Sequence, residues 1–171
     1  MIKFIYLLIF LPLYLLSDSR TLIFAPLPIK DIGDMHTQFL PVIQYLEKKL
    51  NVKIKMDYNS DYDTLLEKFI SGKIDIAYLG PLPYLSLEER YSYAIPLVNF
   101  KNEKQEVSYT CSFVSFISTK NSLENIIDTK IALIQPLSTC GYLFVNDVLN
   151  SSNTNIEKNK YRYVNRHDTV A

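Results

Sequence analysis

The chain has 171 residues, of which 48% are hydrophobic, and its 18 Lys and Arg residues balance 18 Asp and Glu residues. An apolar fraction of this size supports a packed core and argues against intrinsic disorder. The charge balance argues against nucleic acid as a partner, because nucleic-acid-binding domains generally carry a basic face. The length allows one ordinary domain or two small ones.

The N-terminus has the pattern of an export signal. Lys3 precedes an apolar run from Phe4 to Leu16, and the polar residues 17–20 follow it. This run is too short for a membrane-spanning helix, which needs about 20 apolar residues. We therefore predict a signal peptide over residues 1–19 and a periplasmic location. An uncleaved membrane anchor and a buried helix are the alternatives.

The next part of the chain alternates between strand and helix patterns. Strands are expected at 21–25, 52–58, 74–79 and 95–100, and helices at 35–50, 61–71 and 84–90. This alternation predicts a first α/β lobe over residues 20–104, with a mainly parallel sheet flanked by helices. Ligands of such sheets bind outside the carboxyl ends of the strands, which here fall at 25–28, 58–61 and 78–81.

Residues 101–106 are polar or charged and are interpreted as a surface loop that leads to a second α/β lobe, 105–171. Strands are expected at 109–118, 131–134 and 161–164, and helices at 123–128 and 142–149. A sheet this small leaves an apolar face uncovered, so we expect the second lobe to be incomplete and the chain truncated at its C-terminus. A complete small domain with a frayed tail is the alternative.

The stretch from Gln135 to Phe144 leads from the strand pattern at 131–134 into a helical pattern. Such a turn presents free backbone N–H groups and the positive end of a helix dipole, which together favour an anion. Ser138 and Thr139 add hydroxyl donors. We therefore expect an oxyanion site here, with helix capping as the alternative role of both hydroxyls.

Two cysteines, Cys111 and Cys140, leave two possibilities open: a disulfide, which export permits, or two small buried thiols. No cysteine pair has zinc-like spacing and the two histidines lie far apart, so we expect no metal and no cofactor. An enzyme with Cys140 as nucleophile and His167 as base is an alternative, because thiols at helix starts are reactive. Adjacent His167 and Asp168 cannot easily complete that arrangement, so we predict a protein without catalytic activity.

Three motifs together resemble the periplasmic phosphate-, phosphite- and phosphonate-binding proteins of ABC transporters. They are Asp61-Tyr62 with the later stretch Ser71–Pro81, then Tyr109, and finally Pro136–Tyr142 followed by His167-Asp168. The resemblance extends from about Thr21 to the end of the chain. It implies a two-lobed protein that closes on a phosphorus oxyanion, delivers it to an ABC permease in the membrane and catalyses no reaction.

The resemblance also implies the residues that contact the ligand. They are Tyr62, Tyr109, Ser138, Thr139, Cys140 and His167. Cys140 occupies a position where the family usually has serine, and a thiol donates hydrogen bonds more weakly than a hydroxyl, although its backbone N–H still contributes. Family members are longer than this chain, in line with the expected truncation. We predict a monomeric substrate-binding component, with an oxyanion-sensing receptor module as the alternative.

Overall fold

The computed structural model describes residues 20–115 and 126–167. The predicted signal peptide (1–19), half of the predicted helix at 123–128, and Asp168 lie outside these ranges. Within them, no helix is both long enough and apolar enough to cross a bilayer.

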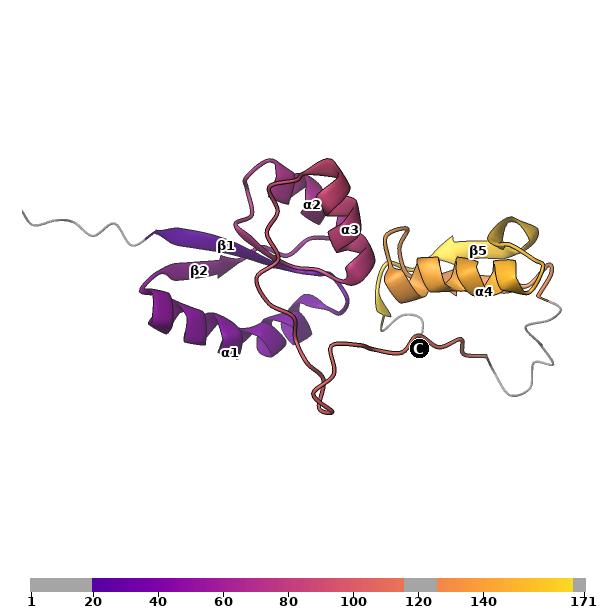
Figure 1. Ribbon diagram of the computed structural model, residues 1–171, viewed down its shortest axis with the longest axis horizontal. Coiled ribbons are helices and arrows are strands. Elements are labelled where there is room, and N and C mark those ends of the chain that lie inside the picture. Colours follow the sequence, from indigo (N-terminus) through magenta and orange to yellow (C-terminus); the bar gives the residue numbers. More distant parts are fainter. Residues whose placement is uncertain (1–19, 116–125, 168–171) are drawn as a thin grey trace, which may run out of the picture.

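The first sheet has three parallel strands, β1 (Thr21–Pro26), β2 (Lys53–Met56) and β3 (Ile76–Tyr78), in the order β2-β1-β3. Figure 1 shows α1 (Ile32–Leu50) along one face of this sheet, with α2 (Tyr62–Ile70) and α3 (Pro81–Arg90) on the other. The predicted parallel sheet with helices on both faces is therefore confirmed for this part of the chain.

Two apolar clusters bury the two faces of the first sheet. The face under α1 packs Phe24, Met35, Phe39, Ile43 and Ile54. The face under α2 and α3 packs Ala25, Leu27, Tyr62, Leu65, Leu66, Ile74 and Leu87. Tyr62 is thus a core residue as well as the first residue of α2, so its ring is held in place by burial.

The second sheet pairs β4 (Lys130–Leu133) with β5 (Lys160–Tyr163) in parallel. A π-helical turn, η2 (Thr139–Phe144), runs directly into α4 (Val145–Ser151), and a short 3-10 helix, η3 (Ile156–Lys158), precedes β5. The apolar contacts between sheet and helix involve Ile126, Leu133, Val145, Leu149 and Ile156. Helix α4 connects the two parallel strands, as the alternating pattern predicted.

Two strand predictions are wrong in the described residues. Residues 95–100 and the described part of 109–118 are irregular and pair with no strand among the described residues. The side chains of Ile95, Leu97 and Val98 are each more than 70% exposed. An apolar pattern marks a segment that can form a strand, but a strand needs a neighbour for its backbone groups. Figure 1 shows this part of the chain, after α3, running irregularly from the first group of elements to the second.

The predicted helix at 123–128 is also wrong in its described part, because residues 126–128 are not helical.

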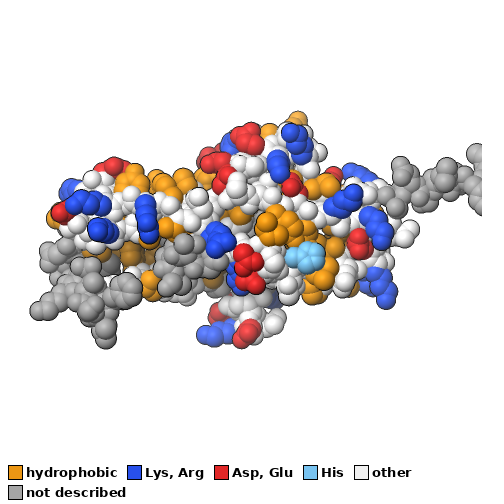
Figure 2. Space-filling view, turned by 180° about the vertical axis from the view of Figure 1, so that it is seen from behind, with side chains coloured by type: hydrophobic (Ala, Val, Ile, Leu, Met, Phe, Trp, Pro, Cys, Tyr) orange, Lys and Arg blue, Asp and Glu red, His pale blue; other side chains and the backbone are white. Residues whose placement is uncertain are grey.

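Figure 2 shows one face of the molecule, on which positive and negative side chains are interspersed. This distribution accords with the zero formal net charge of the chain. The lobe boundary between residues 104 and 105 stays a prediction.

Candidate ligand-binding site

All six residues predicted to contact a ligand line one cavity of about 140 Å³. The other lining residues are Leu27, Ile29, Tyr78, Gly80 and Pro83. None of these five was among the six predicted contacts. Leu27, Tyr78 and Gly80 do lie at the strand ends 25–28 and 78–81, outside which the sequence predicts ligand binding.

Three helices begin at this cavity. Tyr62 is the first residue of α2, Gly80 precedes the first residue of α3, and Thr139 is the first residue of η2, which continues into α4. The first turn of a helix carries N–H groups without helical acceptors and the positive end of the dipole. Three dipole ends of this kind favour negative charge at the cavity without a cationic side chain. The first turn of α3 adds no free N–H group, because Pro81 and Pro83 have none and that of Leu82 donates to Thr139.

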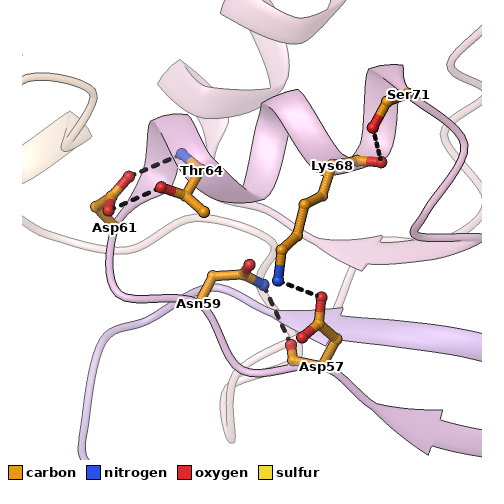
Figure 3. A network of polar contacts seen from close by, with 6 residues as sticks. All are labelled: Asp57, Asn59, Asp61, Thr64, Lys68 and Ser71. Atoms are coloured by element: carbon orange, nitrogen blue, oxygen red, sulfur yellow. Dashed lines mark hydrogen bonds and ion pairs between the residues drawn. The ribbon is translucent and has the colours of Figure 1, made fainter.

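The start of α2 is fixed by a network of polar contacts, drawn in Figure 3. The carboxylate of Asp61 accepts hydrogen bonds from the backbone N–H of Thr64 (2.7 Å) and from its hydroxyl (2.9 Å). Lys68 Nζ lies 2.8 Å from the carboxylate of Asp57, and Asn59 donates to the carbonyl of Asp57 at 3.2 Å. The Lys68–Asp57 contact joins the end of β2 to the last turn of α2, and the Asp61 contacts hold the first turn, which carries Tyr62.

Three tyrosines, Tyr62, Tyr78 and Tyr109, line the cavity, and the pKa is raised for the first two. Burial raises the pKa of Tyr62 to about 12, a hydrogen bond with Ser138 opposes the shift, and nearby Tyr109 adds to it. Burial, and then Tyr109, also raise the pKa of Tyr78. Tyr62 and Tyr78 therefore keep their protons at neutral pH and can donate hydrogen bonds to an anion. Tyr109 is 58% exposed, so it contributes the more accessible edge of the cavity.

His167 reaches the cavity from the segment after β5. Its Nε2 lies 3.4 Å from the hydroxyl of Tyr62, and its backbone N–H donates to the carbonyl of Ile29 at 3.2 Å. The structure therefore places His167 beside Tyr62, which lies 105 positions earlier in the chain.

The turn at Ser138 and Thr139 uses both hydroxyl oxygens as acceptors. Ser138 Oγ accepts from the backbone N–H of Gly141 at 3.0 Å, and Thr139 Oγ1 accepts from the backbone N–H of Leu82 at 3.1 Å. A hydroxyl has one donor hydrogen in addition to its acceptor lone pairs. Capping and oxyanion binding are therefore compatible roles, since capping uses only the acceptor lone pairs of each hydroxyl.

Gly141 allows this turn to pack directly on the end of β4. A Cβ atom at Gly141 would lie 2.5 Å from the side chain of Ile134, closer than real Cβ contacts. Gly141 also accepts, through its carbonyl, a hydrogen bond from the backbone N–H of Ile134. The glycine thus sets how closely the turn approaches the sheet.

Cys111 and Cys140 form a disulfide, with their Cα atoms 5.2 Å apart. This settles the alternative that the sequence left open, and it contradicts an enzyme with Cys140 as a nucleophilic thiol, because neither cysteine is free. The side chain of Cys140 cannot donate a hydrogen bond, so only its backbone N–H remains as a donor. The bond also ties the segment that carries Tyr109 to the turn.

The cavity lining contains no Lys, Arg, Asp or Glu among the described residues. In the same residues, no group of three or more His, Cys, Asp or Glu side chains is arranged to hold a metal ion. The chemistry that this lining offers is therefore hydrogen-bond donation from hydroxyls, a histidine and helix starts. Such donors suit an oxyanion.

Comparison with known proteins identifies relatives by sequence and by fold. The family model of periplasmic substrate-binding proteins of phosphonate ABC transporters matches residues 24–171. The phosphate-import protein PhnD of Mycolicibacterium smegmatis is 27% identical over 128 residues, which are 73% of this chain and 40% of that protein.

Two solved structures share the fold. PhnD1 from Prochlorococcus marinus, in complex with methylphosphonate, has a TM-score of 0.69 and 16% identity, over 90% of this chain and 59% of that one. A binding protein component of a Pseudomonas aeruginosa ABC phosphonate transporter has a TM-score of 0.60 and 17% identity, over 85% of this chain and 51% of that one.

The chain therefore spans roughly two fifths to three fifths of the length of these relatives. The predicted fold class is confirmed, because the α/β arrangement matches part of a two-lobed binding protein. The predicted absence of catalysis also agrees, since the family consists of substrate-binding proteins. As the family model matches most of its length, the chain belongs to the periplasmic substrate-binding proteins of phosphonate ABC transporters.

Proposed function

We propose that this protein binds a small phosphorus oxyanion, phosphate, phosphite or a phosphonate, between two lobes and delivers it to an ABC permease. The observation that carries the proposal is the cavity at which three helices begin beside the Ser138 and Thr139 hydroxyls. The matching family and the resemblance of the site motifs support the same class of ligand.

The donors of the cavity suit a tetrahedral group with several anionic oxygens. Ser138, Thr139 and the backbone N–H of Cys140 come from the turn after β4, and Tyr62 and His167 come from the start of α2 and the segment after β5. All of these can donate hydrogen bonds, and hydrogen bonds to charged groups are worth about 1.5–3 kcal/mol each. Tyr109 closes the outer edge.

The size of the cavity favours a small ligand. Its volume of about 140 Å³ is below the range of about 300–1,000 Å³ that is typical of pockets for drug-sized molecules. We therefore place phosphate, phosphite and methylphosphonate ahead of phosphonates with long substituents. The protein acts in the periplasm as a monomer, exported by the N-terminal signal peptide.

Isothermal titration calorimetry of the purified protein with phosphate, phosphite and methylphosphonate tests this function. Replacing both hydroxyls, Ser138→Ala with Thr139→Ala, should weaken binding at least about 100-fold, because two hydrogen bonds to a charged group are lost. The matched control is Ser151→Ala with Ser152→Ala, which removes two hydroxyls at the other end of α4. Equal affinity in the first double variant and the wild type would overturn the assignment of the site.

A further inference from the structure

Gln135 is a polar residue in the interior, with only 2% of its surface exposed. Both ends of its side-chain amide are used. The oxygen Oε1 accepts from the backbone N–H of Tyr62 at 2.9 Å, and the nitrogen Nε2 donates to the carbonyl of Asn165 at 2.7 Å. Buried polar side chains are generally hydrogen-bonded, and the amide of Gln135 meets this requirement at both of its ends.

The bond to Tyr62 joins parts of the chain that are distant in sequence. Tyr62 is the first residue of α2, so its N–H has no acceptor within the helix. The local cap Asp61 serves the N–H of Thr64 instead. Gln135, which follows β4, therefore supplies the acceptor for Tyr62 from the second sheet's side of the cavity.

Helix α3 is capped in the same way. The backbone N–H of Leu82, in its first turn, donates to the hydroxyl oxygen of Thr139. One turn, from Gln135 to Thr139, thus provides side-chain acceptors for the first turns of two helices of the first lobe. The cavity lies between these two contacts, because its lining includes Tyr62, Gly80 and Thr139.

The bond to Asn165 extends the link to His167. Asn165 is two residues before His167, and its own N–H donates to the carbonyl of Ile134 at 2.8 Å. The side-chain amide of Gln135 thus bonds the backbone of Tyr62 and the backbone of Asn165, two residues before His167. The side chains of Tyr62 and His167 themselves meet at 3.4 Å.

We propose that Gln135 is a positioning residue that links the two lobes and raises the fraction of ligand-free molecules in which the cavity is assembled. It acts through Tyr62 and His167, and it holds the first turn of α2 against the segment after β5. Without it, the assembled cavity becomes a smaller fraction of the population, and the apparent affinity for a ligand falls by that fraction.

Amide hydrogen exchange in the ligand-free protein, followed by NMR, tests the positioning role of Gln135 directly. Gln135→Met keeps the length of the side chain and removes both hydrogen bonds. The Tyr62 amide should then exchange at least about 10-fold faster, while the Thr64 amide of the same turn stays protected by Asp61. Gln38→Met, on the exposed side of α1, is the matched control and should change neither amide. Equal acceleration of both amides, or of neither, would overturn the proposal.

A second variant keeps the test decisive if Gln135→Met does not fold. Gln135→Glu retains the acceptor for the Tyr62 N–H and replaces the donor that faces the Asn165 carbonyl. Its Tyr62 amide should stay protected, whereas the His167 amide, which donates to Ile29, should exchange faster. Unchanged exchange at His167 in this variant would contradict the link to the segment after β5.

The effect on affinity rests on the proposed function and is measured separately, by titrating inorganic phosphate. Binding should weaken at least about 10-fold in Gln135→Met and stay unchanged in Gln38→Met. If the wild type binds phosphate and Gln135→Met binds it equally well, the positioning role is wrong. If the wild type binds none of the three anions, the proposed function fails, and the exchange result alone decides the role of Gln135.

Discussion

The disulfide between Cys111 and Cys140 joins two walls of the cavity, because Tyr109 lies two residues before Cys111 and Thr139 directly precedes Cys140. Within the described part of this segment, residues 109–115 belong to no helix or strand. Apart from the covalent bond, Phe113 contacts the ring of Phe144, with centroids 5.8 Å apart. The disulfide thus restrains the position of Tyr109 from one side, and a hydrogen bond from Asn102 to the carbonyl of Ser108 restrains it from the other.

Breaking this bond should cost stability and loosen the cavity. Cys111→Ser is expected to lower the free energy of unfolding by about 2–4 kcal/mol, because the unfolded chain regains the freedom that the cross-link removed. Urea unfolding with and without a reductant checks this. The reductant should destabilise the wild type and leave Cys111→Ser unchanged. A wild type that shows two reactive thiols in urea without reductant would contradict the disulfide.

Gly141 should tolerate no side chain. Gly141→Ala places a Cβ against Ile134, and relieving that overlap should lower the free energy of unfolding by about 1–3 kcal/mol. Gly72→Asn is the control, because Gly72 has a left-handed backbone, which asparagine adopts, and nothing lies within 4 Å of its Cβ position. Urea unfolding of both variants gives the comparison. A loss in Gly141→Ala no larger than in Gly72→Asn would show that the turn can move away from β4.

The sequence was sufficient for the elements that carry a local pattern. The strand at 52–58, the helix at 35–50 and the helix at 61–71 each reappear, within a few residues, as β2, α1 and α2. These features depend on residues close in sequence. A turn pattern and a family resemblance identified the six candidate contacts, and all six line one cavity in the structure.

Features that depend on distant partners were not predictable. The segment 95–100 has a strand composition, but it pairs with no strand among the described residues. The cysteine pairing depended on a Cα distance that spacing does not reveal. Gln135 gave no pattern at all, because its role depends on Tyr62, which lies 73 positions earlier in the chain. Long-range contacts of this kind require the three-dimensional arrangement.

The Asp61 cap should make part of the stability depend on acidic pH. Burial alone would raise the pKa of Asp61, but hydrogen bonds from Ser60 and Thr64 lower it overall. A lowered pKa in the folded state means that this contribution is present above the ordinary value of 3.8 and is lost as pH falls through the folded value. Asp61→Asn, which still caps but does not titrate, should lose less stability on acidification.

Removal of the same cap tests its size. Asp61→Ala should lower the free energy of unfolding at pH 7 by about 1 kcal/mol, a typical value for a lost N-cap. Asp63→Ala is the control, since it removes a charge from the same turn and leaves the Asp61–Thr64 bonds in place. Thermal unfolding at pH 7 and at pH 3 measures both effects. Equal losses in the two variants would mean that charge, and not capping, supports the start of α2.

Tyr62 should make the protein sensitive to alkali. Its pKa of about 12, raised by burial, lies above the ordinary value of 10.0, so the folded state disfavours the tyrosinate. The contribution of Tyr62 to stability is therefore fully present below pH 10 and is lost as pH rises to about 12. Absorbance at 295 nm, measured against pH, reports how many tyrosines ionise. In Tyr62→Phe the step at the highest pH should contain one tyrosine fewer than in the wild type. Unfolding measured over the same pH range should show a smaller loss of stability in this variant. Tyr45→Phe, at an exposed position on α1, should keep the latest ionisation step and leave the unfolding curve near that of the wild type. If Tyr62→Phe and Tyr45→Phe titrate alike, the hydroxyl of Tyr62 is open to solvent, and the buried wall of the cavity is wrong.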